Sequence, residues 1–201
     1  MGMFANEMVK LANAWLGKSS KNGTHKEIID IYNNYKPHPR GYAVKYDDAW
    51  CATFISALAI KLGYTSIIPP ECGCGEMMKL FQAKGNWIED ENRKPNVGDL
   101  VFYDWNDSGN GNNLGYPRHV GLVVSVGEKT FTTIEGNVNN NVVKRVLDIN
   151  AKTLRGFAVP KYDSEPSESR YEQIGRLCEK VLNDVEGLNS YKELMNLLAE
   201  Q

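Results

Sequence analysis

Residues 50–63, WCATFISALAIKLG, are apolar or small at almost every position. Such a segment is typical of a helix that is buried on all sides. Gly63 follows the last apolar residue and is a typical helix stop, and the helix is expected to begin around Asp47 or Asp48. We therefore predict a central, buried helix with the rest of the domain packed around it.

Three other segments have apolar residues at helical spacing, namely residues 4–16, 28–35 and 76–83. Thr24 and Glu27 fit a capping box before the second of them. Beyond Trp87 the apolar period changes to two, which is typical of strands. The strands expected from this period are 100–105, 119–126, 130–137, 142–147 and 156–159. Helices followed by an antiparallel meander predict an α+β fold.

The composition argues against several classes of protein. The 201 residues are 42% hydrophobic and 24% charged, close to the globular average, which argues against a wholly disordered chain. The net charge of −2 argues against binding nucleic acid through bulk positive charge. No apolar run approaches the roughly 18 residues of a membrane helix, so we expect no membrane insertion. Four cysteines without a CxxC motif and only three histidines lead us to expect no metal or cofactor.

Cys51 lies in the first turn of the predicted central helix. There the helix dipole and the free backbone N–H groups stabilise a thiolate, which is the nucleophilic form of cysteine. Asp47 and Asp48 oppose this by charge repulsion unless one of them caps the helix. The alternative interpretation is a buried packing cysteine, which is how we interpret the other three cysteines.

His119 begins a strand directly after a loop, residues 106–117, that is rich in Gly and Asn. Such a junction can hold a catalytic base on a rigid strand at the side of a cleft, so this loop is expected to border the cleft. His25 and His38 lie in polar or Pro-rich sequence and are expected at the surface.

The hairpin that begins at His119 predicts what surrounds the imidazole. A three-residue turn between its strands places Glu135 and Asn137 on the same face as His119, whereas a two-residue turn sends Glu135 to the opposite face. The apolar residues favour the first register, because it pairs Leu122 with Ile134. We therefore predict that a carboxylate or a carboxamide can reach His119, as the third member of a nucleophile–base–orienter set does.

Four short blocks contain these residues: DAWCA (48–52), GDLVF (98–102), RHVGLV (118–123) and EGN (135–137). In their order, and near its spacing, they resemble the CHAP family of cysteine, histidine-dependent amidohydrolases/peptidases. The resemblance covers about residues 4–162. It implies a papain-like fold of the NlpC type and an enzyme that cleaves bacterial peptidoglycan.

The resemblance also implies roles for single residues. Cys51 corresponds to the nucleophile, His119 to the general base and Glu135 to the residue that orients the histidine. Asn137 corresponds to a further polar member that many CHAP domains carry, and the backbone N–H of Cys51 is expected in the oxyanion hole. The acidic DxDG-type loop with which some phage members bind calcium is absent before Cys51, so the resemblance implies no metal ion here.

The main hypothesis is an endolysin-like, cysteine-dependent peptidoglycan hydrolase that cleaves amide bonds of the stem peptide through a thioester. The bond joins N-acetylmuramic acid to L-alanine in an amidase, or lies within the stem or cross-bridge in an endopeptidase. Trp50, Tyr103 and Trp105 are candidates to line the substrate groove. Two alternatives stay open: an intracellular amidase of small amides, and a non-catalytic papain-like binding module.

The polar segment 163–169 is expected to link a catalytic domain, residues 1–162, to a C-terminal appendage, residues 170–201. Apolar residues at 3–4 spacing predict a helical hairpin in the appendage, which either packs back on the domain or serves homo-oligomerisation or wall targeting. No secretory signal is visible at the N-terminus. The expected location is the phage or host cytoplasm and then the cell wall after holin-type release, or the exterior if a leader is missing from this sequence.

Overall fold

A computed structural model describes residues 3–90, 92–105, 115–162, 178 and 195–196. The chain divides into two compact units, Met1–Ser164 and Glu165–Gln201, and every helix and strand named below belongs to the first. The helical hairpin expected in residues 170–201 lies outside the described residues apart from three positions, so it stays a prediction.

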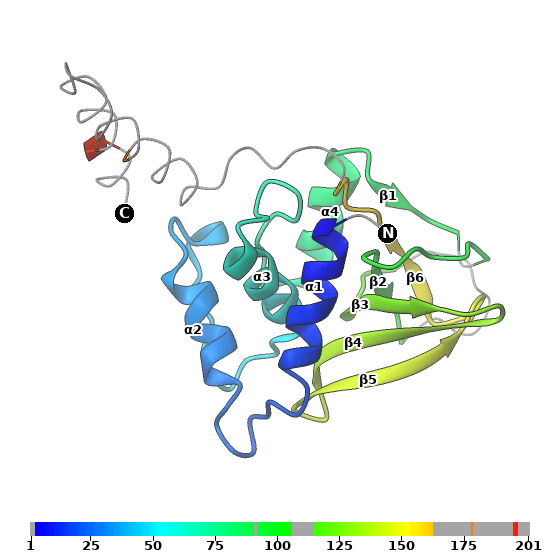
Figure 1. The fold of residues 1–201 in the computed structure, drawn as a ribbon, viewed down its shortest axis with the longest axis horizontal. Helices are drawn as coiled ribbons and strands as arrows, with labels where there is room; N and C mark the ends of the chain where they lie inside the picture. Colours follow the sequence, from blue (N-terminus) through cyan, green and yellow to red (C-terminus); the bar gives the residue numbers. More distant parts are fainter. Residues whose placement is uncertain (1–2, 91, 106–114, 163–177, 179–194, 197–201) are drawn as a thin grey trace. The chain divides into compact units, whose positions relative to one another are not determined.

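The helices confirm the predicted central element. The first unit contains α1 (Met3–Ala14), α2 (Lys26–Asn34), the short 3-10 helix η1 (Pro39–Gly41), α3 (Cys51–Leu62) and α4 (Cys74–Ala83). Every residue of α3 from Cys51 to Ala59 is buried, and α1 and α2 lie on either side of this helix (Figure 1). Gly63 ends α3 at a φ of 75°, the left-handed conformation that glycine adopts without steric cost. None of the described helices is long and apolar enough to cross a membrane.

Two helix starts differ from the predictions. Trp50, not an aspartate, precedes the first residue of α3, because the Asp48 carboxylate accepts hydrogen bonds from the Lys45 backbone N–H and the Tyr42 hydroxyl instead. The expected capping box before α2 is also wrong. The Thr24 hydroxyl accepts a hydrogen bond from the backbone N–H of Ser19, and α2 begins without a side-chain cap.

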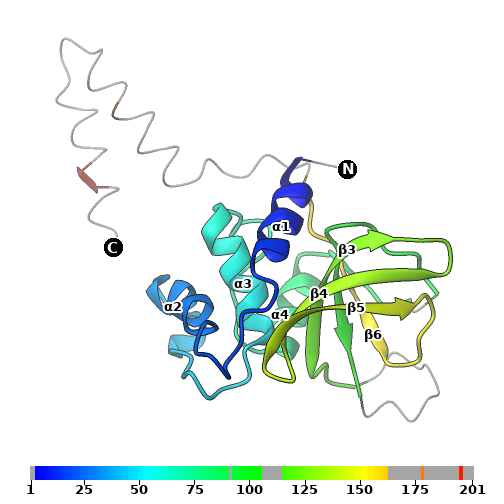
Figure 2. The ribbon, with the colours of Figure 1, turned by 60° about the horizontal axis from the view of Figure 1, so that its bottom comes forward.

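Among the described residues, six antiparallel strands form one sheet beside the helices (Figure 2). They are β1 (Trp87–Ile88), β2 (Leu100–Tyr103), β3 (His119–Val126), β4 (Thr130–Val138), β5 (Asn141–Asp148) and β6 (Leu154–Ala158). The sheet order β1-β6-β2-β3-β4-β5 contains the expected meander from β2 to β5. However, β6 pairs with β2 on the far side of the meander rather than with β5. Helices packed on this antiparallel sheet confirm the α+β fold.

Each face of the sheet carries a buried apolar cluster. Leu122 and Ile134 face the helices and join the main core with α3. Val123 and Phe131 point to the other face, where they form a second, smaller apolar cluster with residues of β2 and β6. The sequence pattern predicted only the first of these cores. It assigned Leu122 and its alternate neighbours to the core, but Val123, on the opposite face of β3, is apolar and buried as well.

The β3–β4 hairpin reaches the predicted register by a different route. Its turn has two residues and is closed by a hydrogen bond from the Gly127 N–H to the Thr130 carbonyl, so the expected three-residue turn is wrong. A β-bulge at Val124 then shifts the pairing by one residue. Beyond the bulge Leu122 pairs with Ile134, as predicted.

Candidate active site

Cys51 is the first residue of α3, and its side chain is buried. The backbone N–H groups of the first helical turn have no acceptor within the helix, so they point toward the start of α3. The pKa of the Cys51 thiol lies well below its ordinary value. The largest cause is a hydrogen bond from the Cys74 thiol, and the hydrogen bond and charge of His119 add to it, so that together they outweigh the opposing effect of burial.

His119, the first residue of β3, connects Cys51 to a carboxylate. Its Nε2 lies 2.8 Å from Oε2 of Glu135, which leaves Nδ1 as the ring nitrogen for Cys51. Burial lowers the pKa of the imidazole, but hydrogen bonds to Cys51 and Glu135 and the charges of both groups outweigh it and raise the pKa to about 9. Both shifts favour the thiolate of Cys51 beside the imidazolium of His119.

Glu135 is fully buried and ionised. Burial raises the pKa of its carboxyl, but the hydrogen bond and charge of His119, with further donors, lower it overall. Tyr103 and Thr133 donate to Oε1 at 2.7 and 2.6 Å, while Oε2 accepts from His119 and, at 3.0 Å, from Arg145. A buried carboxylate is stable only when its lone pairs are satisfied in this way.

Asn137 differs from the other predicted site residues, because its side chain has no hydrogen bond with His119 or Glu135, and its role stays a prediction. It is half-buried, and no hydrogen bond of its side chain with a described residue is found. Its backbone has a φ of +64°, and the β4–β5 pairing shifts between Glu135 and Val138. This irregularity interrupts the alternation that was expected to place Asn137 beside His119.

The three predicted groove residues differ in exposure. Trp50 and Tyr103 are 1% and 0% exposed and therefore offer almost no surface to a ligand. Trp105 is 44% exposed. Its ring stacks on Tyr103 with centroids 5.0 Å apart and lies 6.0 Å from the imidazole of His119. Of the three rings, only Trp105 can cover a substrate beside the imidazole.

Cys74 is the neighbour of Cys51 that sequence reasoning missed. It is the first residue of α4, and its Sγ lies 3.4 Å from Sγ of Cys51. The hydrogen bond to Cys51, followed by burial, raises the pKa of the Cys74 thiol well above its ordinary value. The one signal in the sequence was its place just before the helix expected from residue 76.

The other two histidines do not contact Cys51. His25 is 3% exposed, so its expected surface position is wrong. Its Nε2 lies 2.9 Å from the carbonyl oxygen of Tyr46, and its ring lies against Trp50. His38 is half-buried and stacks on Tyr32. No group of three or more His, Cys, Asp or Glu side chains in the described part of the chain is placed to hold a metal ion.

The candidate active-site residues lie within a segment that matches a known protein family. Residues 39–137 match the family model described as the CHAP domain, and this segment contains Cys51, Cys74, His119 and Glu135. No curated protein and no solved structure matched the chain.

Proposed function

Because residues 39–137 are a CHAP domain, from a family of cysteine- and histidine-dependent amidohydrolases and peptidases, we propose that this protein is a peptidoglycan hydrolase. It cleaves amide bonds of the stem peptide through a thioester on Cys51. We further propose that it acts as an endolysin in bacterial lysis.

The interaction of Cys51 with His119, and the hydrogen bond between His119 and Glu135, carry the proposal. Each of the three roles of a cysteine hydrolase has a side chain of the right chemistry: a thiolate, an imidazolium beside it, and an ionised carboxylate behind the imidazole. The Glu135 carboxylate fixes the orientation of the imidazole and keeps a proton on Nε2, the ring nitrogen that faces the carboxylate.

The proposed reaction has two steps. The Cys51 thiolate attacks the amide carbonyl, and His119 gives a proton to the leaving amine nitrogen as the C–N bond breaks. His119 then takes a proton from water, which attacks the thioester and releases the carboxylic acid and the thiolate. Backbone N–H groups at the start of α3 support the negative oxygen in both steps, because they have no acceptor within the helix.

Two exposed rings support a sugar–peptide substrate. Trp105 lies beside His119, and Tyr116, which is 53% exposed, lies on the first turn of α4 next to Cys74. A Cβ atom on Gly75 would be only 1.9 Å from the Tyr116 ring, so the ring lies directly on the backbone there. Exposed aromatic faces of this kind provide apolar surface for sugar rings and for the alkyl parts of a peptide.

The test uses purified peptidoglycan of several chemotypes, with turbidity and the masses of released fragments as readouts. Wild type and the Cys72→Ser variant are expected to clear the suspension, whereas Cys51→Ala is expected to release no fragments. Cys72 is the matched control, because it is a half-buried cysteine whose sulfur accepts a hydrogen bond from Arg40 rather than from Cys74.

The fragments also identify the bond. Stem peptides free of muramic acid mark an amidase, whereas shortened or unlinked stems mark an endopeptidase. Clearing by Cys51→Ala would contradict the assignment of the nucleophile. If wild type releases nothing from any chemotype, peptidoglycan is not the substrate, and small amides become the next substrates to test.

A further inference from the structure

Two cysteines from different helices meet at the candidate nucleophile. Cys51 begins α3, Cys74 begins α4, and their sulfur atoms are 3.4 Å apart. A disulfide needs an S–S distance of about 2.0 Å, so the sulfurs need to approach by only about 1.4 Å, which changes of side-chain torsion can supply. The mechanism above uses only one of these two sulfurs.

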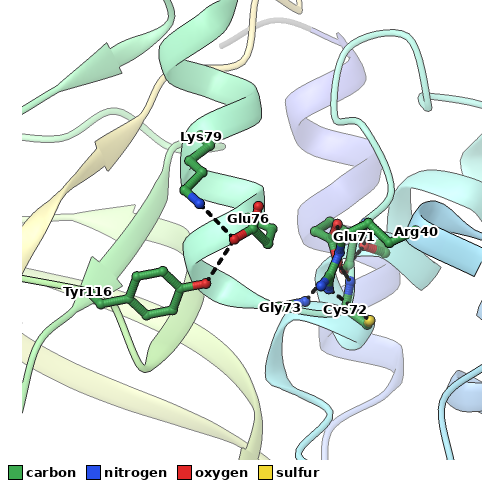
Figure 3. A network of polar contacts seen from close by, with 8 residues as sticks. Arg40, Glu71, Cys72, Gly73, Glu76, Lys79 and Tyr116 are labelled. Carbon is green, nitrogen blue, oxygen red and sulfur yellow. Dashed lines mark hydrogen bonds and ion pairs between the residues drawn. The ribbon is translucent and has the colours of Figure 1, made fainter. Parts of the chain in front are cut away.

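The segment before α4 is held firmly against α3. The buried Glu71 exchanges two hydrogen bonds with Ser56 of α3: the Ser56 hydroxyl donates to the Glu71 carbonyl at 2.6 Å and accepts from its N–H at 2.8 Å. The Glu71 carboxylate accepts two hydrogen bonds from the Arg40 guanidinium and also bonds the backbone N–H groups of Cys72 and Gly73 (Figure 3). Cys74 follows Gly73 in the chain, so these hydrogen bonds also position Cys74 next to Cys51.

The two sulfurs differ in protonation. The pKa of Cys51 is lowered and that of Cys74 is raised, chiefly because the Cys74 thiol donates a hydrogen bond to the Cys51 sulfur. These opposite shifts favour a pair in which Cys51 is the thiolate and Cys74 keeps its proton. Oxidants attack the thiolate of such a pair first, and the neighbouring thiol is in place to resolve the product.

From this juxtaposition we propose that Cys51 and Cys74 are a site of reversible oxidation to an intramolecular disulfide, with a peroxide as the oxidant. The Cys51 thiolate attacks hydrogen peroxide, the O–O bond breaks, and Cys51 becomes a sulfenic acid while hydroxide leaves. The sulfur of Cys74 then attacks the sulfur of Cys51. The S–S bond forms as the S–O bond breaks, and the departing oxygen leaves as water with the proton of Cys74.

The disulfide protects Cys51 and stops its chemistry. A sulfur bound to Cys74 cannot attack a carbonyl, and it cannot proceed to the sulfinic and sulfonic acids, which dithiols do not reduce. Disulfide formation itself does not depend on the proposed hydrolase function, but the accompanying loss of hydrolysis does. A dithiol such as dithiothreitol is expected to restore the thiol pair by exchange.

The experiment maps the oxidised protein by mass spectrometry after hydrogen peroxide treatment of wild type, Cys74→Ser and Cys72→Ser. In wild type and Cys72→Ser we expect a linked peptide pair containing Cys51 and Cys74, with a mass lower by two hydrogen atoms, that dithiothreitol separates. In Cys74→Ser we expect no link. Instead, Cys51 gains oxygen atoms that dithiothreitol does not remove.

Several results would overturn this inference. One is irreversible oxidation of Cys51 in wild type, as expected for Cys74→Ser. Another is a disulfide between Cys74 and Cys72. The third is a Cys51 that stays reduced while peroxide oxidises other residues. The mapping of wild type alone decides the question if Cys74→Ser does not fold. Because this readout is a mass, it stays valid if the protein does not hydrolyse peptidoglycan. Where hydrolysis is found, it is expected to be lost on oxidation and to return with dithiothreitol.

Discussion

Glu135 carries a negative charge in a place that water does not reach. The charge is stable there because His119, Arg145, Tyr103 and Thr133 all donate hydrogen bonds to the carboxylate. In turn it stabilises the imidazolium form of His119, which then stabilises the thiolate of Cys51. At the scale of residues, the reactivity of the sulfur thus depends on a carboxylate on the far side of the imidazole.

We predict that the hydrolysis rate of wild type falls above about pH 9, because His119 then loses the proton that the leaving amine needs. In Glu135→Gln the carboxylate charge that raises the pKa of His119 is gone. The loss of rate on the alkaline side of the pH–rate profile, its alkaline limb, should therefore begin at lower pH. The maximal rate should fall about 10²-fold. The measurement is the initial rate on peptidoglycan as a function of pH.

Glu128→Gln is the control for the loss of a carboxylate, because Glu128 lies exposed in the β3–β4 turn. Its pH profile should match that of wild type. An alkaline limb that stays in place in Glu135→Gln would show that Glu135 does not set the protonation of His119.

At the scale of elements, the β3–β4 hairpin brings the imidazole and the carboxylate together. The bulge at Val124 compensates for the two-residue turn and keeps Glu135 on the face of His119. Gly121 completes the arrangement, since an added Cβ would lie 2.6 Å from Cγ and 3.1 Å from Cδ of Glu135. The glycine is required for close packing here rather than for an unusual backbone conformation.

We predict that Gly121→Ala displaces the Glu135 side chain and lowers the hydrolysis rate while the protein stays folded. Overpacking of this kind typically costs about 1–3 kcal/mol of unfolding free energy. The measurements are the hydrolysis rate and guanidinium unfolding. Gly127→Ala, in the exposed turn of the same hairpin with its nearest neighbour atom at 3.2 Å, should keep the wild-type rate. A Gly121→Ala variant as active as wild type would contradict the role given to this contact.

At the scale of the whole first unit, buried carboxylates join distant parts of the chain. The Glu71 carboxylate connects the segment before α4 to Arg40, while the Glu71 backbone bonds the Ser56 hydroxyl of α3. The Glu135 carboxylate connects strands β2 to β5 through its four donors. Burial raises the pKa of each carboxyl, but the hydrogen bonds and nearby positive charges outweigh it and lower the pKa overall. Asp99 has the opposite shift, because burial raises its pKa.

We predict that acid destabilises the fold and that Glu71 contributes to this effect. A carboxyl with a lowered pKa stabilises the folded state above its unfolded pKa of about 4.3, and this stabilisation is lost as the pH falls through the folded pKa. Protonation of Asp99 acts in the opposite direction, whereas Glu71 and Glu135 both have lowered pKa values. Guanidinium unfolding of wild type should therefore show a falling free energy of unfolding below about pH 4.3.

Glu71→Gln tests this contribution. The variant should be less stable than wild type by about 1–3 kcal/mol at neutral pH, because charged hydrogen bonds of a buried group are lost. The difference should narrow in acid, where the wild-type carboxyl is itself protonated. Glu76→Gln, at the half-exposed carboxylate on the first turn of α4 in Figure 3, should change the stability little. If the difference in unfolding free energy between Glu71→Gln and wild type does not change with pH, the ionisation of Glu71 does not contribute to the acid sensitivity of the fold.

Local patterns were sufficient for the four longer helices, for strands β2 to β6 and for the faces of the hairpin. The uniform apolarity of residues 51–59 predicted a buried helix, and Gly63 predicted where this helix ends. The alternation of apolar residues predicted the pairing of Leu122 with Ile134 even though the turn was wrong. These features follow from sequence because burial selects one face of a helix or strand, and the period of apolar residues records that selection.

Other contacts around the candidate active site depended on tertiary packing. Cys74 lies beside Cys51 where the Glu71–Ser56 hydrogen bonds hold the segment before α4 against α3. Arg145 reaches Glu135 from a neighbouring strand, and His25 is buried against Trp50. Apolar periodicity specifies which side of an element is buried, but it does not specify which partner lies opposite. The partner depends on how separate elements pack together, and in this protein that packing places a second thiol beside the nucleophile.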